Sequence, residues 1–388
     1  MTVTCEPLPA RLTDGQRVPG EEPPTRIMSL DVLRGVAVLL VLCHHTLPIN
    51  QTVVGYHWWL TLKVRQVGWS GVDLFFVLSG FLVGGLLCAA HRRTGKIDPL
   101  RFLGRRAFKI YPAFYALLAI TFLGQIYAAQ VIEFWPWVGE VCFLQNYVGR
   151  VWRHTWSLAV EEHFYVVIAA VMWVASSTGT LDRRRVIVSG CVLVLFSVLT
   201  YRCWLMMTVP FNRETHMFAT HVRIDSLLFG SLLAYWWHFE CDATIRIMRR
   251  YCLLWSVAAI ACLWPLTQRA YDSPLIHGPG FTLNYLGFGA VMMLGLAGCF
   301  SKIERHCRWI SVPLVFIGRR SYGIYLVHMA AYHLIDDLLP ETMVFDARFF
   351  LHAGLSTVLS VALGALMTAL IEAPALRLRE RCLPATIR

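Results

Sequence analysis

Ten long runs of apolar residues divide this sequence, and they restrict its fold more than any other feature. Each run has about 17–25 residues, the length that an α-helix needs to cross the hydrocarbon core of a bilayer. Of the 388 residues, 57% are hydrophobic and 15% are charged, whereas soluble domains carry about 25% charged residues. The sequence therefore predicts an all-α membrane bundle of about ten transmembrane helices. The runs lie at 29–48, 70–90, 108–129, 156–177, 185–206, 221–238, 251–267, 281–300, 313–333 and 350–372.

The basic residues between the runs predict how the helices are oriented. If the N-terminus is cytoplasmic, 25 of the 35 Lys and Arg residues fall in cytoplasmic segments, seven on the opposite side and three inside runs. Short cytoplasmic loops of membrane proteins are enriched in Lys and Arg, which explains the net charge of +11 without a nucleic acid as partner. We expect cytoplasmic tails at 1–28 and 375–388, with a ten-helix transmembrane domain at 29–374 between them.

The first apolar run contains two residues that are costly to bury in a bilayer, Arg34 and His45. They are 11 residues apart, about three helical turns, so they share one helix face roughly 16 Å apart along the axis. Two interpretations remain open. Arg34 reaches the cytoplasmic interface and His45 is a hydrogen-bonded core histidine, or both face a functional cavity.

Glu161 lies five residues inside a run that begins on the outer side, at a depth similar to that of His45. A carboxylate paired with His45 would raise the basicity of the imidazole and fix its tautomer, as a general base requires. A structural ion pair of Glu161 is the alternative. Glu161 and His163 are two residues apart and do not share a helix face, so we predict no metal site here.

Polar residues near the outer ends of other runs form a second group of candidates. His221, Arg223 and Asp225 begin the sixth run, and His221 and Asp225, four residues apart, are expected to share a face. The alternative is an ion-pair and capping cluster at the membrane surface. Asp73 is either a functional residue or a surface carboxylate. Tyr325 and His328 are either a hydrogen-bonded pair in the core or residues that contact the acceptor.

Six sequence blocks, in order along the chain, resemble the acyltransferase-3 family of integral membrane O-acyltransferases. The first block contains an Arg, ten residues and a His, matched here by Arg34 and His45. The third resembles the family's Trp-Ser-Leu-x-x-Glu block. The blocks are LDVLRGVAVLLVLCHH (30–45), GVDLFFVLSGFLV (71–83), TWSLAVEEHFY (155–165), THVRIDSLLFG (220–230), SYGIYLVH (321–328) and IEAP (371–374).

The resemblance implies a role for each of these residues. His45 would be the general base with Glu161 orienting it, and Arg34, Arg106 and Lys109 would bind the phosphates of the donor. Lys109 stands where the family has an Arg, and it lacks the bidentate guanidinium. The residues expected to contact or support the acceptor are Asp73, Trp156, Ser157, His221, Arg223, Asp225, Tyr325 and His328.

The function implied by the resemblance is transfer of an acetyl or other short acyl group. The donor would be a cytoplasmic acyl-CoA, used as a co-substrate with no bound cofactor, and the acceptor a hydroxyl of a sugar, glycoconjugate or related small molecule. The protein would lie in the cytoplasmic membrane of a bacterium. Two alternatives remain: a proton-coupled transporter or flippase of a polar metabolite, and a structural membrane subunit. The sequence does not indicate an oligomeric state.

Overall fold

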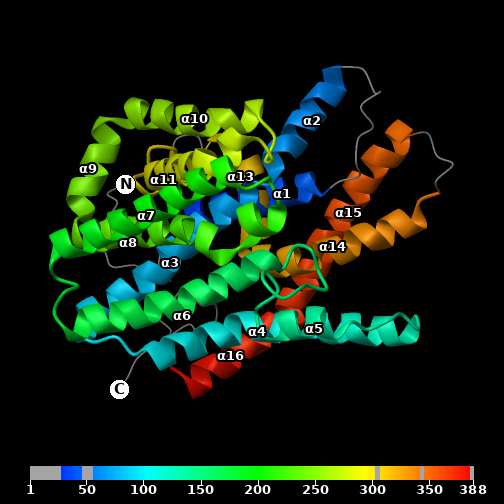
Figure 1. Ribbon diagram of the computed structural model, residues 1–388, viewed down its shortest axis with the longest axis horizontal. Coiled ribbons are helices and arrows are strands. Elements are labelled where there is room, and N and C mark those ends of the chain that lie inside the picture. Colours follow the sequence, from blue (N-terminus) through cyan, green and yellow to red (C-terminus); the bar gives the residue numbers. More distant parts are fainter. Residues whose placement is uncertain (1–27, 46–55, 302–305, 341–344, 385–388) are drawn as a thin grey trace.

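The computed structural model describes residues 28–45, 56–301, 306–340 and 345–384, and within these residues every regular element is a helix. The elements of the first half of the chain are α1 (Met28–His44), α2 (Tyr56–Gly68), α3 (Gly71–Thr94), α4 (Pro99–Tyr127), α5 (Phe134–Val141), α6 (Trp156–Ser177) and α7 (Arg184–Thr208). In this half, the helix α3 packs against α1 and α6 (Figure 1).

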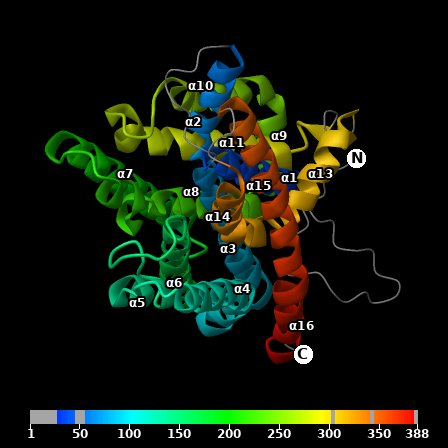
Figure 2. The ribbon, with the colours of Figure 1, turned by 90° about the vertical axis from the view of Figure 1, so that its right-hand side faces the viewer.

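The second half completes the bundle with several broken helices. Its elements are the π-turn η1 (Glu214–Phe218), the 3₁₀ turn η2 (Thr220–Val222), α8 (Ile224–Phe239), α9 (Cys241–Arg250), α10 (Cys252–Gln268), the π-turn η3 (Ile276–Gly280), α11 (Phe281–Leu296), α13 (Arg308–Arg319), α14 (Ser321–Leu338), α15 (Phe345–Met367), the π-turn η4 (Thr368–Glu372) and α16 (Ala373–Cys382). At the end of the described chain, α16 packs against α4 (Figures 1 and 2).

The helical membrane class predicted from the sequence is confirmed. Among the residues that the structure describes, six helical stretches are long and apolar enough to cross a bilayer, or seven if α9 and α10, which meet at 83°, are counted as one span. Each of the ten apolar runs coincides with a helix or a broken helix pair, but ten spans and cytoplasmic termini stay predictions. The run at 313–333 is not one continuous helix, because α13 ends at Arg319 and α14 starts at Ser321.

Local sequence explains how the loop between α3 and α4 ends one helix and starts the next. Gly95 takes a left-handed conformation (φ 69°) and its N–H bonds the carbonyl of His91, which closes the C-terminus of α3. Asp98 then caps α4, because its side chain accepts the N–H of Arg101 at 2.9 Å, and Pro99 occupies the first turn.

The helix α3 lies at the centre because glycines let it approach α8 closely. A Cβ on Gly80 would lie 1.9 Å from the carbonyl oxygen of Leu227, and a Cβ on Gly230 would lie 2.2 Å from that of Val77. In lipid, helices associate through such close backbone packing, because hydrocarbon solvent provides no hydrophobic force between them. The α3–α8 contact therefore depends on residues without side chains.

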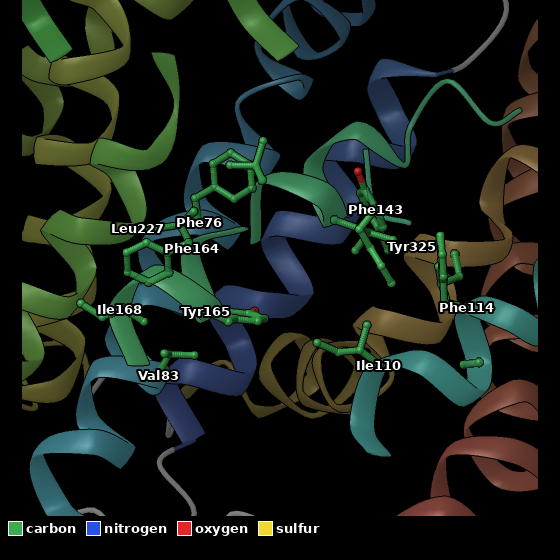
Figure 3. Packing of buried hydrophobic residues seen from close by; sticks show 14 of the residues in the cluster. Phe76, Val83, Ile110, Phe114, Phe143, Phe164, Tyr165, Ile168, Leu227 and Tyr325 are labelled. Carbon is green, nitrogen blue, oxygen red and sulfur yellow. The ribbon is translucent and has the colours of Figure 1, made fainter. Parts of the chain in front are cut away.

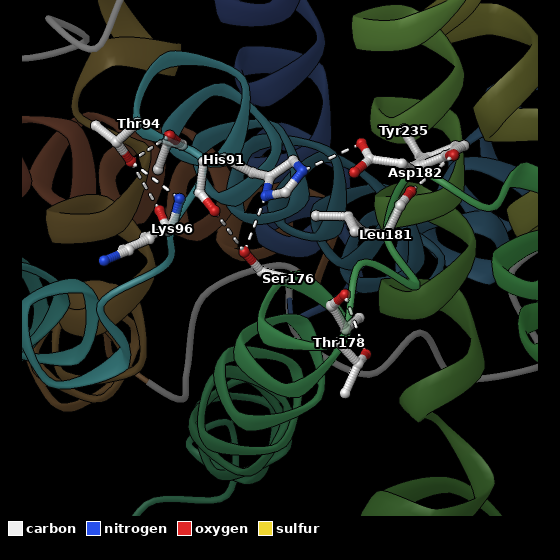
Figure 4. Close-up of polar contacts among 11 residues, drawn as sticks. His91, Thr94, Lys96, Ser176, Thr178, Leu181, Asp182 and Tyr235 are labelled. Atoms are coloured by element: carbon white, nitrogen blue, oxygen red, sulfur yellow. Dashed lines mark hydrogen bonds and ion pairs between the residues drawn. The ribbon is translucent and has the colours of Figure 1, made fainter.

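A polar cluster ties the basic end of α3 to α6 and to the loop before α7 (Figure 4). The Nδ1 of His91 lies 2.9 Å from the Oγ of Ser176, and its Nε2 lies 3.2 Å from the Oδ1 of Asp182. This order resembles a hydrolase triad. Ser176, however, lies in the last turn of α6, where the negative end of the helix dipole disfavours an oxyanion, and its hydroxyl donates to the Gly95 carbonyl at 3.3 Å. We interpret the cluster as a structural clamp.

Substitution of Gly80 by Ala should destabilise the bundle, because the added methyl group forces α3 and α8 apart. Overpacking of this kind costs about 1–3 kcal/mol. Gly190→Ala in α7 is the matched control, since a Cβ there meets nothing within 4 Å, and alanine should stabilise that helix by roughly 0.5–1 kcal/mol. Thermal unfolding midpoints in detergent measure both. Equal midpoints for the two variants would contradict the close α3–α8 contact.

Candidate functional site

A cavity of about 770 Å³ extends along α3 between α4, α6 and α14. Its α3 lining reaches from Val72 to Thr94, which is roughly 33 Å of helix at 1.5 Å per residue and comparable to the roughly 30 Å of a bilayer core. Its apolar walls belong to a cluster of side chains from α3, α4, α6, α8 and α14 (Figure 3). The cavity thus reaches from one end of the bundle deep towards the other.

One end of the cavity is strongly basic. Its lining holds ten Lys and Arg side chains and four carboxylates. Some of the basic groups are already paired, since Arg105 bonds Glu380 at 2.8 Å and Lys109 bonds the buried Glu372. The excess positive charge suits an anionic ligand such as a phosphate. The basic residues are Arg34, Arg93, Lys96, Arg101, Arg105, Arg106, Lys109, Arg319, Arg377 and Arg379.

All three residues predicted to bind the donor line this cavity. Arg34 bonds Asp31 at 3.2 Å and keeps 26% of its side-chain surface exposed. The guanidinium of Arg106 lies over the ring of Tyr165, 5.2 Å from its centroid. The ion pair of Lys109 with Glu372 joins α4 to the chain just before α16, so Lys109 has a structural role that the sequence did not reveal.

Glu161 lines the middle of the same cavity. It accepts a hydrogen bond from the hydroxyl of Tyr165 at 2.5 Å, and the Oγ of Ser79 lies 2.7 Å from that hydroxyl. Its neighbour Glu162 lines the cavity too and accepts a hydrogen bond from Tyr111 at 3.1 Å. Both acids reach the cavity because it is wide enough to cover two faces of α6.

At the deep end, Tyr325 and Phe75 line the cavity. The Tyr325 hydroxyl donates to the carbonyl of His154 at 2.7 Å and lies 2.6 Å from the Oγ of Ser157. Its ring packs edge-on against Phe75, with centroids 6.0 Å apart. Both Ser157 and Tyr325 were candidates from the sequence, and the structure brings them together.

His45 lies one layer of side chains beyond Tyr325. Its ring centroid is 5.1 Å from that of His328, whose own ring is 5.5 Å from that of Tyr325. In the described part of the chain, His45 and Glu161 share no hydrogen bond, and Glu161 is held by Tyr165 instead. The expected neighbour of His45 is thus replaced by an imidazole, because the faces of α1 and α14 meet where the sequence suggested α1 and α6.

Comparison with known proteins identifies the kind of molecule that carries this cavity. The sequence profile of the acyltransferase-3 family, described as an acyltransferase domain, matches residues 27–370. The chain belongs to this family. The match covers most of the chain, and several helices of the described chain are long and apolar enough to cross a membrane, as expected of a multi-pass membrane protein.

Individual relatives of this chain include proteins of Staphylococcus aureus. The O-acetyltransferase OatA is 27% identical over 329 residues, which cover 79% of this chain and 50% of the relative. A putative O-acetyltransferase of strain COL is 26% identical over 359 residues, covering 86% of this chain and 55% of the relative. The chain thus spans about half the length of the curated relatives it matches. No solved structure matches it.

Several residues expected near the acceptor form a network of buried charges in this protein instead. Asp73 pairs with Arg223 and accepts from the amide of Asn284 at 3.0 Å, and Asp225 pairs with Arg202 at 2.8 Å. These four charged side chains are almost fully buried, so neither pair lies at the surface. Buried pairs of this kind hold helices in register, because a single charge left alone would be very costly.

The prediction that His221 and Asp225 share a helix face is wrong. The residues from Thr220 to Val222 form a 3₁₀ turn, and α8 begins only at Ile224, so the four-residue spacing does not apply. His221 is exposed and its Nδ1 lies 3.1 Å from the hydroxyl of Tyr147. Trp156 is buried, and the Arg223 guanidinium lies 5.6 Å from its ring centroid, so it supports the charge network.

Sequence reasoning missed His154, Tyr165 and Glu140. Glu140 is buried and accepts hydrogen bonds from the N–H groups of Val151 and Trp152 and from Thr155, at 3.1, 3.0 and 2.7 Å. Burial raises its pKa, while these donors lower it. The only available signal was an acidic residue within an aromatic segment.

Replacing Arg223 by Leu should destabilise the protein strongly, because Asp73 would stay buried without its counter-ion. Breaking a buried pair costs about 3–5 kcal/mol. Arg348→Leu is the control: its pair with Asp336 is partly exposed and should be worth at most about 1 kcal/mol. Thermal unfolding in nanodiscs compares the two. A loss no larger for Arg223→Leu than for the control would refute the buried network.

Proposed function

We propose that this acyltransferase moves an acetyl or other short acyl group from acyl-CoA to a hydroxyl of a sugar, glycoconjugate or related small molecule. The observation that supports this most is the cavity along α3, with its basic mouth and its polar, aromatic deep end. The name of the two Staphylococcus aureus relatives, O-acetyltransferase, favours acetyl as the transferred group and oxygen as the acceptor atom. A bacterial cytoplasmic membrane crossed by ten helices is part of the same proposal.

The basic mouth is suited to the phosphates of coenzyme A. Arginine guanidinium groups bind phosphate oxygens through paired hydrogen bonds, and Arg101, Arg105 and Arg106 follow one another along one helix, α4. The more apolar part of the cavity, towards Phe75 and Tyr325, would then receive the acyl-bearing arm of the coenzyme. In this arrangement the thioester points towards Glu161, Ser157 and Tyr325.

The reaction requires a base at the deep end. The acceptor oxygen attacks the thioester carbonyl, a C–O bond forms, the C–S bond breaks, and the hydroxyl proton ends on the departing thiolate. His45 would take that proton in the transition state, a contribution of about 10²–10⁴-fold. Glu161, held by Tyr165, would act on the donor side of Tyr325 rather than on His45.

A transporter would also need a cavity of this length, but family membership favours an enzyme. Acyl transfer also explains the separation of a basic donor end from the histidines beyond Tyr325. The partners in this proposal are lipid, acyl-CoA and a hydroxyl-bearing acceptor.

Acetyl-CoA turnover by purified protein in nanodiscs tests the proposal. We expect slow release of CoA that His45→Ala lowers about 10²-fold or more in kcat, whereas Arg106→Ala raises KM about 10- to 100-fold through loss of a charged hydrogen bond of about 1.5–3 kcal/mol. CoA should be quantified by chromatography, since the exposed Cys142 and Cys382 react with thiol reagents.

Arg185→Ala provides the control for non-specific charge effects, because Arg185 is exposed near the same end of the bundle and does not line the cavity. It should turn over acetyl-CoA like the wild type. Equal changes of KM in Arg185→Ala and Arg106→Ala would argue against a donor site in the cavity. Wild-type turnover by folded His45→Ala would remove His45 as the base.

A further inference from the structure

We propose that His328 is the positioning residue that fixes the tautomer of His45, by accepting its ring N–H and leaving the other ring nitrogen as the base. The inference rests on the proposed function, in which His45 is the base. It replaces the carboxylate that the sequence suggested, Glu161, by a neutral imidazole.

His328 presents a lone pair rather than a proton towards its free side. Its Nδ1 lies 2.6 Å from the carbonyl oxygen of Tyr325, and because a carbonyl only accepts, Nδ1 carries the hydrogen. In the neutral ring Nε2 is then an acceptor. This Nε2 is buried and has no hydrogen-bond partner among the described residues, His45 included. The proposed bond therefore requires the His45 ring to turn its N–H towards Nε2, and the two rings, whose centroids lie 5.1 Å apart, are close enough for this. A proton placed there without an acceptor would be costly.

His154 is fixed in the same way. Its Nε2 lies 3.1 Å from the carbonyl oxygen of Leu326, so Nε2 carries the hydrogen and Nδ1 is the acceptor. Burial lowers the pKa of His154 to about 3, so the ring is neutral at physiological pH. The rings of His154 and His328 are in contact, with centroids 4.7 Å apart, but each already donates its N–H to a carbonyl, so neither donates to the other.

The third neighbour of His45, His44, is also a donor to a carbonyl. Its Nδ1 lies 3.2 Å from the carbonyl oxygen of Arg65. The rings of His44 and His328 each lie 5.1 Å from the ring of His45. Both contacting rings thus donate their N–H to a main-chain carbonyl and offer His45 only an acceptor nitrogen. In a hydrogen bond with either ring, His45 must therefore be the donor.

Of these acceptors, His328 is the one that most needs the hydrogen from His45. The free nitrogen of His328 is buried and unpartnered, whereas that of His44 is not among the buried unpartnered atoms of the described chain. Donation to His328 leaves the second nitrogen of His45 unprotonated. His45 itself is only half-buried, and in this proposal its second nitrogen is the one that meets the acceptor hydroxyl. No group of three or more described His, Cys, Asp or Glu side chains is arranged to hold a metal ion, so a metal does not explain the cluster.

Three variants test the role of His328 by steady-state acetyl-CoA turnover. His328→Leu removes the acceptor and should lower kcat by about 10²–10³-fold, since a wrong tautomer can cost up to about 10⁴-fold. His328→Gln supplies an amide oxygen in its place and should recover at least tenfold of that loss. KM for acetyl-CoA should stay within twofold in both, because the donor site lies on the other side of Tyr325.

The matched control is His352→Leu. His352 is likewise buried, and its Nε2 lies 3.2 Å from the carbonyl of Tyr332, but it does not contact His45. It should lose stability without losing kcat. If His328→Leu does not fold, His328→Phe, which keeps the ring volume without a nitrogen, takes its place.

The outcomes separate this inference from the proposed function. Loss of turnover in His45→Ala together with wild-type kcat in folded His328→Leu would overturn the role of His328 alone. Equal losses in His328→Leu, His328→Gln and His352→Leu would also overturn it, since they indicate packing. Wild-type turnover in His45→Ala would instead overturn the proposed function.

Discussion

The high cost of an unpaired charge in a bilayer governs this structure. Asp73 on α3 and Arg223 just before α8 neutralise each other in the protein interior, and Asp225 and Arg202 do the same beside them. Neither Asp73 nor Arg223 can be placed elsewhere without leaving a charge alone. These pairs, together with the glycine contacts between α3 and α8, fix the central helix around which the other helices pack.

Because α3 is fixed on one face, its other face can line a cavity without collapse. The cavity is polar and basic at one end and lined by the contacting rings of Phe75 and Tyr325 at the other. Its charged residues are not all available to a ligand, since Lys109 and Arg105 also hold the C-terminal segment through Glu372 and Glu380. A residue can thus both hold the fold together and line the site.

Beyond Tyr325, the side chains that contact His45 are imidazoles and not carboxylates. The histidines at positions 44, 154 and 328 each place a ring nitrogen against a main-chain carbonyl, and this fixes their tautomers without any carboxylate. A neutral imidazole is far cheaper to bury than an ion. The rings that contact the proposed base, those of His44 and His328, are therefore held by main-chain carbonyls and not by carboxylates.

The sequence by itself determined the helical membrane class and the residues that deserve attention, because apolar length and isolated charges carry those signals directly. Arg34 and Glu161 were found from isolated charges and Tyr325 from a deep polar pair, whereas Arg106, Lys109 and Ser157 followed from the family resemblance. All six line one cavity. Only the tertiary structure decided which of them meet. Pairings such as Arg223 with Asp73, or His45 with His328, join residues far apart in sequence, and helical spacing is blind to them. Spacing failed even locally at His221, where a 3₁₀ turn interrupts the helix.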